Sequence, residues 1–212
     1  MGAAQPASDD AARLGPDPDE GLARSAAGGD ANAFEELVRR HAGLVLGLGI
    51  RVLGSRADAE ALLQDVFMKI HGALPSFRGE STFKTWVARV TLNAARNRKR
   101  DEGRRLRLVT SLDAPLKGDE NSTLADRISD GAPSPERQAL SMDARARIER
   151  ALARLPEEFR VVLILREIEG LSYDEIALAL EIQPGTVKSR LARARGRLQE
   201  ELADLVDRGD SP

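Results

Sequence analysis

The sequence predicts an all-α protein with two small helical domains joined by a flexible acidic linker, the C-terminal domain being a helix-turn-helix. Only 3% of the 212 residues are aromatic, too few for a sheet-rich chain of this length. The residues that dominate the chain, Ala, Leu, Arg and Glu, are strong helix formers. Apolar positions recur at helical spacing along two stretches, and the region between these stretches has no sustained period.

Composition and periodicity divide the chain into parts. The first residues include Gly, Pro and Ala but few large apolar side chains, so they cannot bury enough surface to fold. Helical spacing then persists to Arg100, with breaks at Gly54-Ser55 and from Pro75 to Glu80 that predict three or four helices. The predicted parts are a disordered tail at 1–28, a helical domain at 29–100, a linker at 101–137, a second helical domain at 138–206 and a disordered end at 207–212.

Composition also excludes several classes of protein. With no Cys, the chain has no disulfide framework, thiolate zinc site or cysteine nucleophile. No apolar run approaches the roughly 20 residues that span a bilayer, and the N-terminus lacks the basic start and apolar core of a secretory signal. The expected location is therefore the cytoplasm, without membrane insertion.

Catalytic signatures are missing from the sequence as well. It contains no Gly-rich phosphate loop, no HExxH and no GxSxG. The two histidines, His41 and His71, have no partner at metal-ligand spacing. We therefore expect no enzyme, no metal site and no cofactor.

Charge is unevenly distributed although the formal net charge is only -2. Residues 84–107 contain nine Lys or Arg against two acids, and residues 188–197 contain five cations and no acid. Residues 113–137 contain six acids against three cations, which makes the linker acidic. Two basic segments of this kind indicate anionic partners, nucleic acid above all.

The segment 59–70 predicts an amphipathic helix. One side is expected to be buried, and its members are Ala59, Leu63, Val66, Phe67 and Ile70. The other side is left exposed and could take a partner helix, although an ordinary surface helix has the same pattern. This exposed side consists of Ala61, Gln64, Asp65 and Met68.

A second helix is predicted from Thr82 to Arg100, and one of its faces combines three chemistries. One aromatic, one aliphatic, two amide and one cationic side chain fall within about 40° of a single line along the helix. These residues are Trp86, Val90, Asn93, Asn97 and Arg100. Single-stranded DNA requires a cationic track, a flat apolar surface for stacking and amides that pair with an extruded base. We expect the Trp86 indole and the Asn93 amide to be accessible to unpaired bases.

The C-terminal block predicts a helix-turn-helix. Ser172 and Glu175 have the spacing of a capping box, which starts a helix from Tyr173 to about Leu180. Pro184 is suited to open the next helix after a tight turn. The second helix has one apolar stripe for the core, made of Val187, Leu191, Ala194 and Leu198.

The opposite face of this second helix is small and basic. Like charges repel one another on a helix surface unless an anion neutralises them, and the DNA major groove would do so. A helix that merely solubilises the domain would have the same charges, but the turn before it favours DNA binding.

Several of these motifs together resemble the bacterial sigma factors, with the extracytoplasmic-function group as the best match. In the C-terminal block the resemblance lies in Leu155–Leu163, Glu169–Ala177 and Gly185–Leu191. In the N-terminal block it lies in Ala59–Phe67 and in Ser81–Asn97. Glu181 departs from the family, which often has Gly at this turn. Either a positive φ there costs about 1 kcal/mol or the turn adopts another geometry.

The resemblance implies a role for each segment. The helix that includes residues 59–70 would dock on the clamp helices of RNA polymerase, the helix that starts at Thr82 would melt and read the −10 element, and the last helix would read the −35 element. The implied polymerase-binding residues are Ala61, Gln64, Asp65 and Met68. The implied −10 residues are Trp86, Arg89, Asn93, Arg96, Asn97, Arg98 and Lys99. The implied −35 residues are Thr186, Lys188, Ser189, Arg190, Arg193, Arg195 and Arg197.

The resemblance also implies partners, which are core RNA polymerase, promoter DNA and an anti-sigma factor. In the family the acidic linker threads the RNA path of the polymerase, but acidic linkers are common and the role stays open here. The alternative is a helix-turn-helix regulator that binds duplex operator DNA only. Such a regulator would have no use for Trp86 and Asn93.

Overall fold

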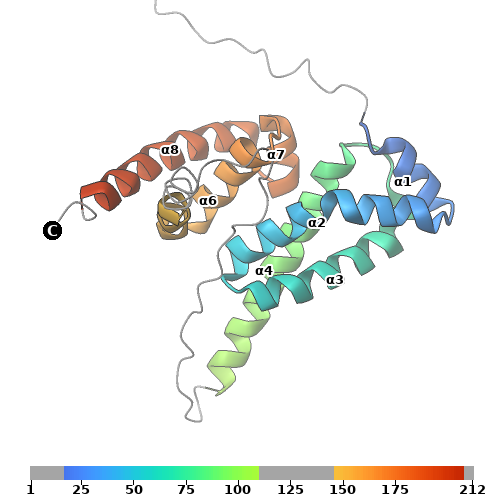
Figure 1. Ribbon diagram of the computed structural model, residues 1–212, viewed down its shortest axis with the longest axis horizontal. Coiled ribbons are helices and arrows are strands. Elements are labelled where there is room, and N and C mark those ends of the chain that lie inside the picture. Colours follow the sequence, from blue (N-terminus) through green and yellow to red (C-terminus); the bar gives the residue numbers. More distant parts are fainter. Residues whose placement is uncertain (1–16, 110–145, 208–212) are drawn as a thin grey trace, which may run out of the picture.

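The computed structural model describes residues 17–109 and 146–207, and these residues are helical with no strand among them (Figure 1). The all-α prediction is confirmed. The N-terminal helices are α1 (Glu20–Ala27), α2 (Ala31–Leu53), α3 (Arg56–Ala73), the 3-10 turn η1 (Leu74–Ser76) and α4 (Phe83–Val109). The C-terminal elements are a helix at 146–154, α6 (Glu157–Leu163), the π-helical turn η2 (Ile164–Ile168), α7 (Tyr173–Leu180) and α8 (Pro184–Asp207).

The breaks between the N-terminal helices follow from local chemistry. Gly54 ends α2 with a φ of 78°, a conformation that glycine adopts without steric cost. The Ser55 hydroxyl then accepts a hydrogen bond from the amide of Asp58 and caps α3. Gly49 lets α2 and α3 approach closely, since an added Cβ would lie 3.0 Å from the Cβ of Ala59.

The predicted disorder of residues 1–28 is wrong for α1. Ala23 and Ala26 are buried in the core. The buried carboxylate of Asp19 accepts a hydrogen bond from Arg40 at 2.8 Å and lies 2.8 Å from Nε2 of His41. The burial of Ala23 and Ala26 and the contacts of the Asp19 carboxylate with Arg40 and His41 therefore order this segment. Residues 1–16 of the predicted tail lie outside the described residues.

Helix α4 also continues nine residues beyond the boundary predicted at 100, through Gly103 to Val109. A single glycine costs a helix only about 1 kcal/mol, and the Arg, Glu and Leu around it are strong helix formers. The rest of the predicted linker, 110–137, lies outside the described residues, as do positions 208–212 of the predicted end.

The helix-turn-helix forms as predicted. The Ser172 hydroxyl accepts from the amide of Glu175 at 3.2 Å, and the Glu175 carboxylate accepts from the amide of Ser172 at 2.9 Å. Glu181 ends α7 in the left-handed conformation with a φ of 57°, so this glutamate takes the position for which glycine is better suited. The α8 stripe faces the core, with Val187, Leu191 and Ala194 buried and Leu198 half-buried.

The two domains pack directly against each other. Helix α7 lies against α4, and α6 lies against α2 (Figure 1). The direct contact involves the N-terminal part of α4, the helix that carries the predicted strand-binding residues. No helix in the described ranges is long and apolar enough to cross a membrane.

Candidate nucleic-acid interface

The exposed face of α8 presents free cations. Lys188, Ser189 and Arg193 are exposed, and within residues 17–109 and 146–207 no carboxylate pairs with Lys188 or Arg193. The Ser189 hydroxyl donates to the carbonyl of Thr186 at 3.0 Å, which leaves its lone pairs outward. This part of α8 is therefore available to an anionic partner.

Three other predicted −35 residues are held within their own domain. Arg190 forms an ion pair with Glu158 at 3.0 Å, and Arg195 forms one with Glu167 at 2.7 Å. The guanidinium of Arg197 lies 5.0 Å above the ring of Phe159. These contacts attach α8 to α6 and η2. DNA phosphates would therefore have to share each of these cations with its intramolecular partner.

The expectation that Trp86 offers an open stacking surface is wrong for this structure, because only 8% of the residue is exposed. Its ring packs on Phe77 at a centroid distance of 5.0 Å and on Phe83 at 5.6 Å. The prediction considered only the spacing of residues within α4. It could not include Phe77, which belongs to the preceding loop and covers the indole.

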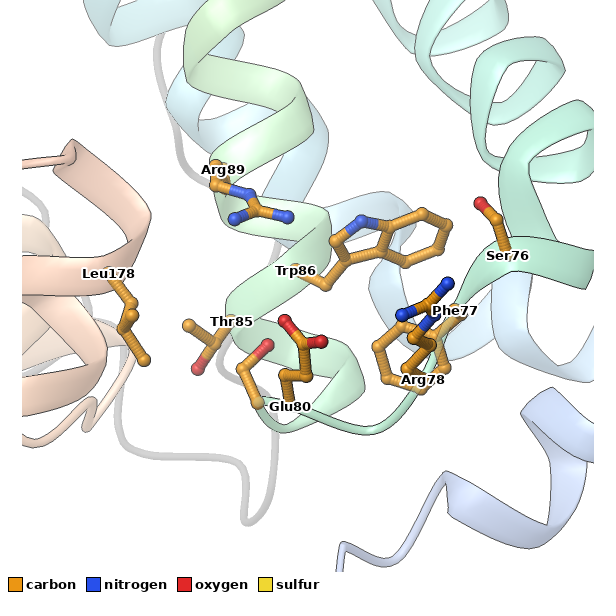
Figure 2. Close-up of a pocket in the computed structure, with 9 residues that line it drawn as sticks. Ser76, Phe77, Arg78, Glu80, Thr85, Trp86, Arg89 and Leu178 are labelled. Atoms are coloured by element: carbon orange, nitrogen blue, oxygen red, sulfur yellow. The ribbon is translucent and has the colours of Figure 1, made fainter.

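The indole nevertheless lines a half-open hollow of about 250 Å³ at the N-terminal end of α4 (Figure 2). The hollow combines an aromatic wall, two guanidinium groups, a carboxylate and three hydroxyls. Its lining residues are Ser76, Phe77, Arg78, Glu80, Ser81, Thr85, Trp86, Arg89 and Leu178. The loop residues among them, Ser76 to Glu80, were not predicted from the sequence. A signal was present, because a polar segment directly precedes the helix of Trp86.

The remaining α4 residues have different partners. The Asn93 amide donates to the Glu181 carboxylate at 3.4 Å, and Lys99 pairs with Glu157 at 2.7 Å. Arg89 and Arg96 are half-buried, and the exposed Asn97 accepts a hydrogen bond from Arg100.

Arg98 lies on another side of α4. Its guanidinium is 3.5 Å from the carboxylates of both Asp58 and Asp65, which belong to α3. The structure thus brings Arg98 to the predicted polymerase-binding helix, where it lines a hollow together with Asn97, Asp58 and Asp65.

The predicted polymerase-binding surface on α3 is exposed. Met68 is 74% exposed, Gln64 and Asp65 are also exposed, and Ala61 is half-buried. On the buried side the structure differs from the prediction at one position, because Leu62 is buried and Leu63 only half-buried. Among the described residues, Met68 is the most exposed large hydrophobic side chain.

Both histidines contact side chains of other helices or of the segment before α1. His41 lies next to Asp19, and His71 contacts the Phe34 ring at 4.8 Å. Among the residues that the structure describes, no group of three or more His, Asp or Glu is placed to hold a metal ion.

Comparisons with known proteins identify both domains. The family described as "Sigma-70 region 2" matches residues 37–105, and "Sigma-70, region 4" matches residues 145–198. The "RNA polymerase sigma-H factor" of Pseudomonas aeruginosa is 37% identical over 191 residues, which cover 89% of this chain and 95% of the relative. The "ECF RNA polymerase sigma-E factor" of Escherichia coli K12 is 36% identical over 185 residues, which cover 85% of this chain and 92% of the relative.

Two solved structures are similar over most of the chain. The first is the sigma factor RpoE in complex with the anti-sigma factor NepR from Bartonella quintana, with a TM-score of 0.61 and 25% identity, covering 80% of this chain and 96% of that chain. The second is CnrH in complex with the cytosolic domain of CnrY, with a TM-score of 0.57 and 27% identity, covering 91% of this chain and 99% of that chain.

The two sigma-70 matches also decide between the alternatives. A regulator that shares only the helix-turn-helix with sigma factors would match the family at 145–198 but not at 37–105. With relatives of comparable length named as sigma factors, the chain belongs to the sigma-70 family, in the extracytoplasmic-function group of sigma factors that bind core RNA polymerase and direct promoter-specific transcription initiation.

Proposed function

We propose that this sigma factor divides promoter recognition between α8, which reads the −35 element, and the Trp86 hollow with the adjoining face of α4, which captures the −10 strand. The observation that carries the proposal is the separation of two cationic surfaces with different chemistry. The surface on α8 is a convex helix, whereas the one on α4 adjoins a hollow with an aromatic wall.

The α8 surface suits a major groove. A recognition helix inserts its N-terminal part into the groove, where side chains reach the base edges. Lys188, Ser189 and Arg193 lie on the exposed side of this part, and with Arg190 they are the proposed contacts to base edges or their neighbours. Thr186, Arg195 and Arg197 are the proposed phosphate contacts, which position the helix without reading sequence.

The hollow suits an extruded base. An enzyme or binding protein that reads a flipped base surrounds it with apolar or aromatic walls and hydrogen-bonding groups. Trp86 and Phe77 supply the wall, Thr85 and Glu80 supply hydrogen-bonding oxygens, and Arg78 and Arg89 supply cations for the adjoining phosphates. Asn93, Arg96, Asn97 and Lys99 would extend this track along α4.

Arg98 is assigned a different role from the one that the sequence predicts. Its contacts with Asp58 and Asp65 support a role in orienting the α3 surface for polymerase. That surface consists of Ala61, Gln64, Asp65 and Met68. An anti-sigma factor is a further proposed partner, supported by the similar structure of a sigma factor in complex with an anti-sigma factor. The proposed site of action is the cytoplasm, and the proposed activity involves no catalysis by this chain.

Run-off transcription tests the proposal. The purified chain is combined with core RNA polymerase and a library of duplex DNA with randomised −35 and −10 regions, and the transcribed templates are sequenced. The proposal predicts two enriched blocks at a constant spacing. The Arg193→Ala variant should relax the upstream block only, and the Asn93→Ala variant should relax the downstream block only. Enrichment of a single block, or loss of both blocks in each variant, would contradict the division.

A further inference from the structure

A carboxylate from the segment before α1 binds the first backbone amide of α4. The amide of Phe83 donates to Oδ2 of Asp17 at 2.6 Å, across 66 positions of the chain. The other oxygen of this carboxylate, Oδ1, accepts from the amide of Asp19 at 3.0 Å and forms the turn that leads into α1. One half-buried side chain therefore joins the start of α1 to the start of α4.

This hydrogen bond lies at the part of the helix that most needs one. The first amides of an α-helix have no acceptor within the helix, so its first turn opens readily. In α4 the Thr82 hydroxyl accepts from the amide of Thr85 at 3.2 Å, and Asp17 supplies the acceptor for the amide of Phe83. The helix dipole also favours a carboxylate at this end. Asp17 thus completes the cap of α4 although it does not belong to that helix.

Phe83 connects this cap to the aromatic wall of the Trp86 hollow. Its side chain is fully buried, and the centroid of its ring lies 5.6 Å from those of both Phe77 and Trp86. These two neighbouring rings form the apolar wall of the hollow (Figure 2). Because Trp86 follows Phe83 by about one turn of α4, a displacement of the first turn would move the indole as well.

The segment before α1 also supports the ring of Phe83. The His41 ring lies 5.3 Å from the Phe83 ring, and Nε2 of His41 lies 2.8 Å from the buried carboxylate of Asp19. Helix α1 itself packs against η1, which leads into the loop of the hollow. Residues 17–19 therefore hold Phe83 directly at its amide and through His41 at its ring. These contacts all lie within the N-terminal domain, so they do not depend on the position of the C-terminal domain.

We propose that Asp17 is a positioning residue for promoter opening, because its carboxylate fixes the first turn of α4 and thereby the Phe77 and Trp86 rings that an extruded base would meet. The inference rests on the proposed strand-binding role of the hollow. A site whose walls are held in place before the ligand arrives does not have to order them on binding. Loss of the carboxylate should therefore leave the surfaces of α3 and α8 unchanged and slow the entry of the strand into the hollow.

Fluorescence of Trp86 measures the positioning directly, because the chain has a single Trp. In Asp17→Ala the amide of Phe83 loses its acceptor, and we expect emission at longer wavelengths and quenching by acrylamide at least about twofold stronger. Asp17→Asn has one acceptor oxygen for two amide donors, so its emission should lie between those of Asp17→Ala and the unchanged chain. Circular dichroism checks that each variant keeps its helices.

Asp30→Ala is the matched control. The Asp30 carboxylate caps α2 and accepts from the amides of Asn32 and Ala33 at 2.9 and 3.2 Å, but Asp30 does not line the hollow. This variant loses a helix cap in the same domain and should keep the emission of Trp86. Unchanged emission in Asp17→Ala, or an equal change in Asp30→Ala, would overturn the positioning role and leave the strand-binding role of the hollow intact.

Promoter opening supplies the second readout. Each variant is combined with core RNA polymerase and a promoter recovered from the randomised library, with a fluorescent adenine analogue in the −10 element that brightens as the strand unpairs. At saturating holoenzyme, opening should be about fivefold slower with Asp17→Ala and within about twofold of the unchanged rate with Asp30→Ala. A changed Trp86 emission with an unchanged opening rate would overturn the inference by a different route, because it would remove the strand-binding role of the hollow.

Discussion

The carboxylate of Glu175 joins the two domains through Thr85. One oxygen accepts the Thr85 hydroxyl at 2.9 Å, while the other accepts the amide of Ser172 at 2.9 Å and completes the capping box of α7. The cap that starts the helix-turn-helix therefore also binds the N-terminal domain. Burial acts to raise the pKa of Glu175, but the hydrogen bonds from Ser172, Thr82 and Thr85 outweigh it, and the pKa is lowered.

Acid should weaken this junction. A carboxyl whose pKa is lowered by folding contributes stability that is fully present above its ordinary pKa and is lost as the pH falls through the lowered value. The difference in unfolding free energy between the unchanged chain and Glu175→Gln should therefore be constant from pH 6 to pH 7 and shrink below about pH 4. Urea unfolding at a series of pH values measures it. A difference that is independent of pH would show that the ionised carboxylate contributes nothing.

Substitution of Asp19 should release α1. The Asp19→Ala variant leaves Arg40 and His41 without their buried acceptor, at a cost of about 1–3 kcal/mol. Hydrogen exchange should show loss of protection in α1 before any change in α3. Glu20→Gln is the matched control, since Glu20 forms only an exposed pair with Arg24. Equal protection of α1 in both variants would mean that Ala23 and Ala26 alone hold the helix.

Two glycine substitutions should have opposite effects. Gly49→Ala places a Cβ 3.0 Å from the Cβ of Ala59 and pushes α2 from α3, which should destabilise the fold by about 1–3 kcal/mol. Gly103→Ala meets no atom within 4 Å and should stabilise the end of α4 by up to about 1 kcal/mol. Thermal unfolding followed by circular dichroism measures both. A stabilising Gly49→Ala would refute the close helix contact.

Arg193 should contribute to discrimination at the −35 element. Its guanidinium is exposed and has no carboxylate partner in the described residues, so Arg193→Ala should lower discrimination by about 1–3 kcal/mol. Competition between the selected and a scrambled −35 duplex measures this. Arg195→Ala is the comparison variant. Because Arg195 pairs with Glu167 and is a proposed phosphate contact, its substitution should weaken binding to both duplexes alike. An unchanged preference in Arg193→Ala would exclude direct readout by this residue.

What could be predicted from the sequence is local. The capping box at Ser172 and the break at Gly54 depend on residues within four positions of one another, and both are present in the structure. For Glu181 the sequence left a positive φ and another turn geometry open, and the structure has the positive φ. The α8 stripe follows from helical spacing, and three of its four members are fully buried. Short-range hydrogen bonds and helix geometry are sufficient to determine these features.

What could not be predicted depends on contacts between distant residues. The order of α1 requires Asp19 to meet His41, and the burial of Trp86 requires the loop that carries Phe77. The pairing of Arg98 with Asp58 depends on the packing of α4 on α3. No periodicity in the sequence encodes the distance between such residues, so helical spacing could place Trp86 on one face of α4 with Asn93 but could not predict that Phe77 covers the indole.

Permanganate footprinting of unpaired thymines measures whether α4 opens the −10 element in a promoter complex. Promoter complexes are formed with core polymerase and either the unchanged chain or Asn93→Ala, at concentrations that give equal closed-complex occupancy. Reactive thymines at the −10 element should appear with the unchanged chain and decline at least about tenfold with Asn93→Ala, because the amide no longer pairs with the extruded base. Equal reactivity in the two complexes would contradict the account.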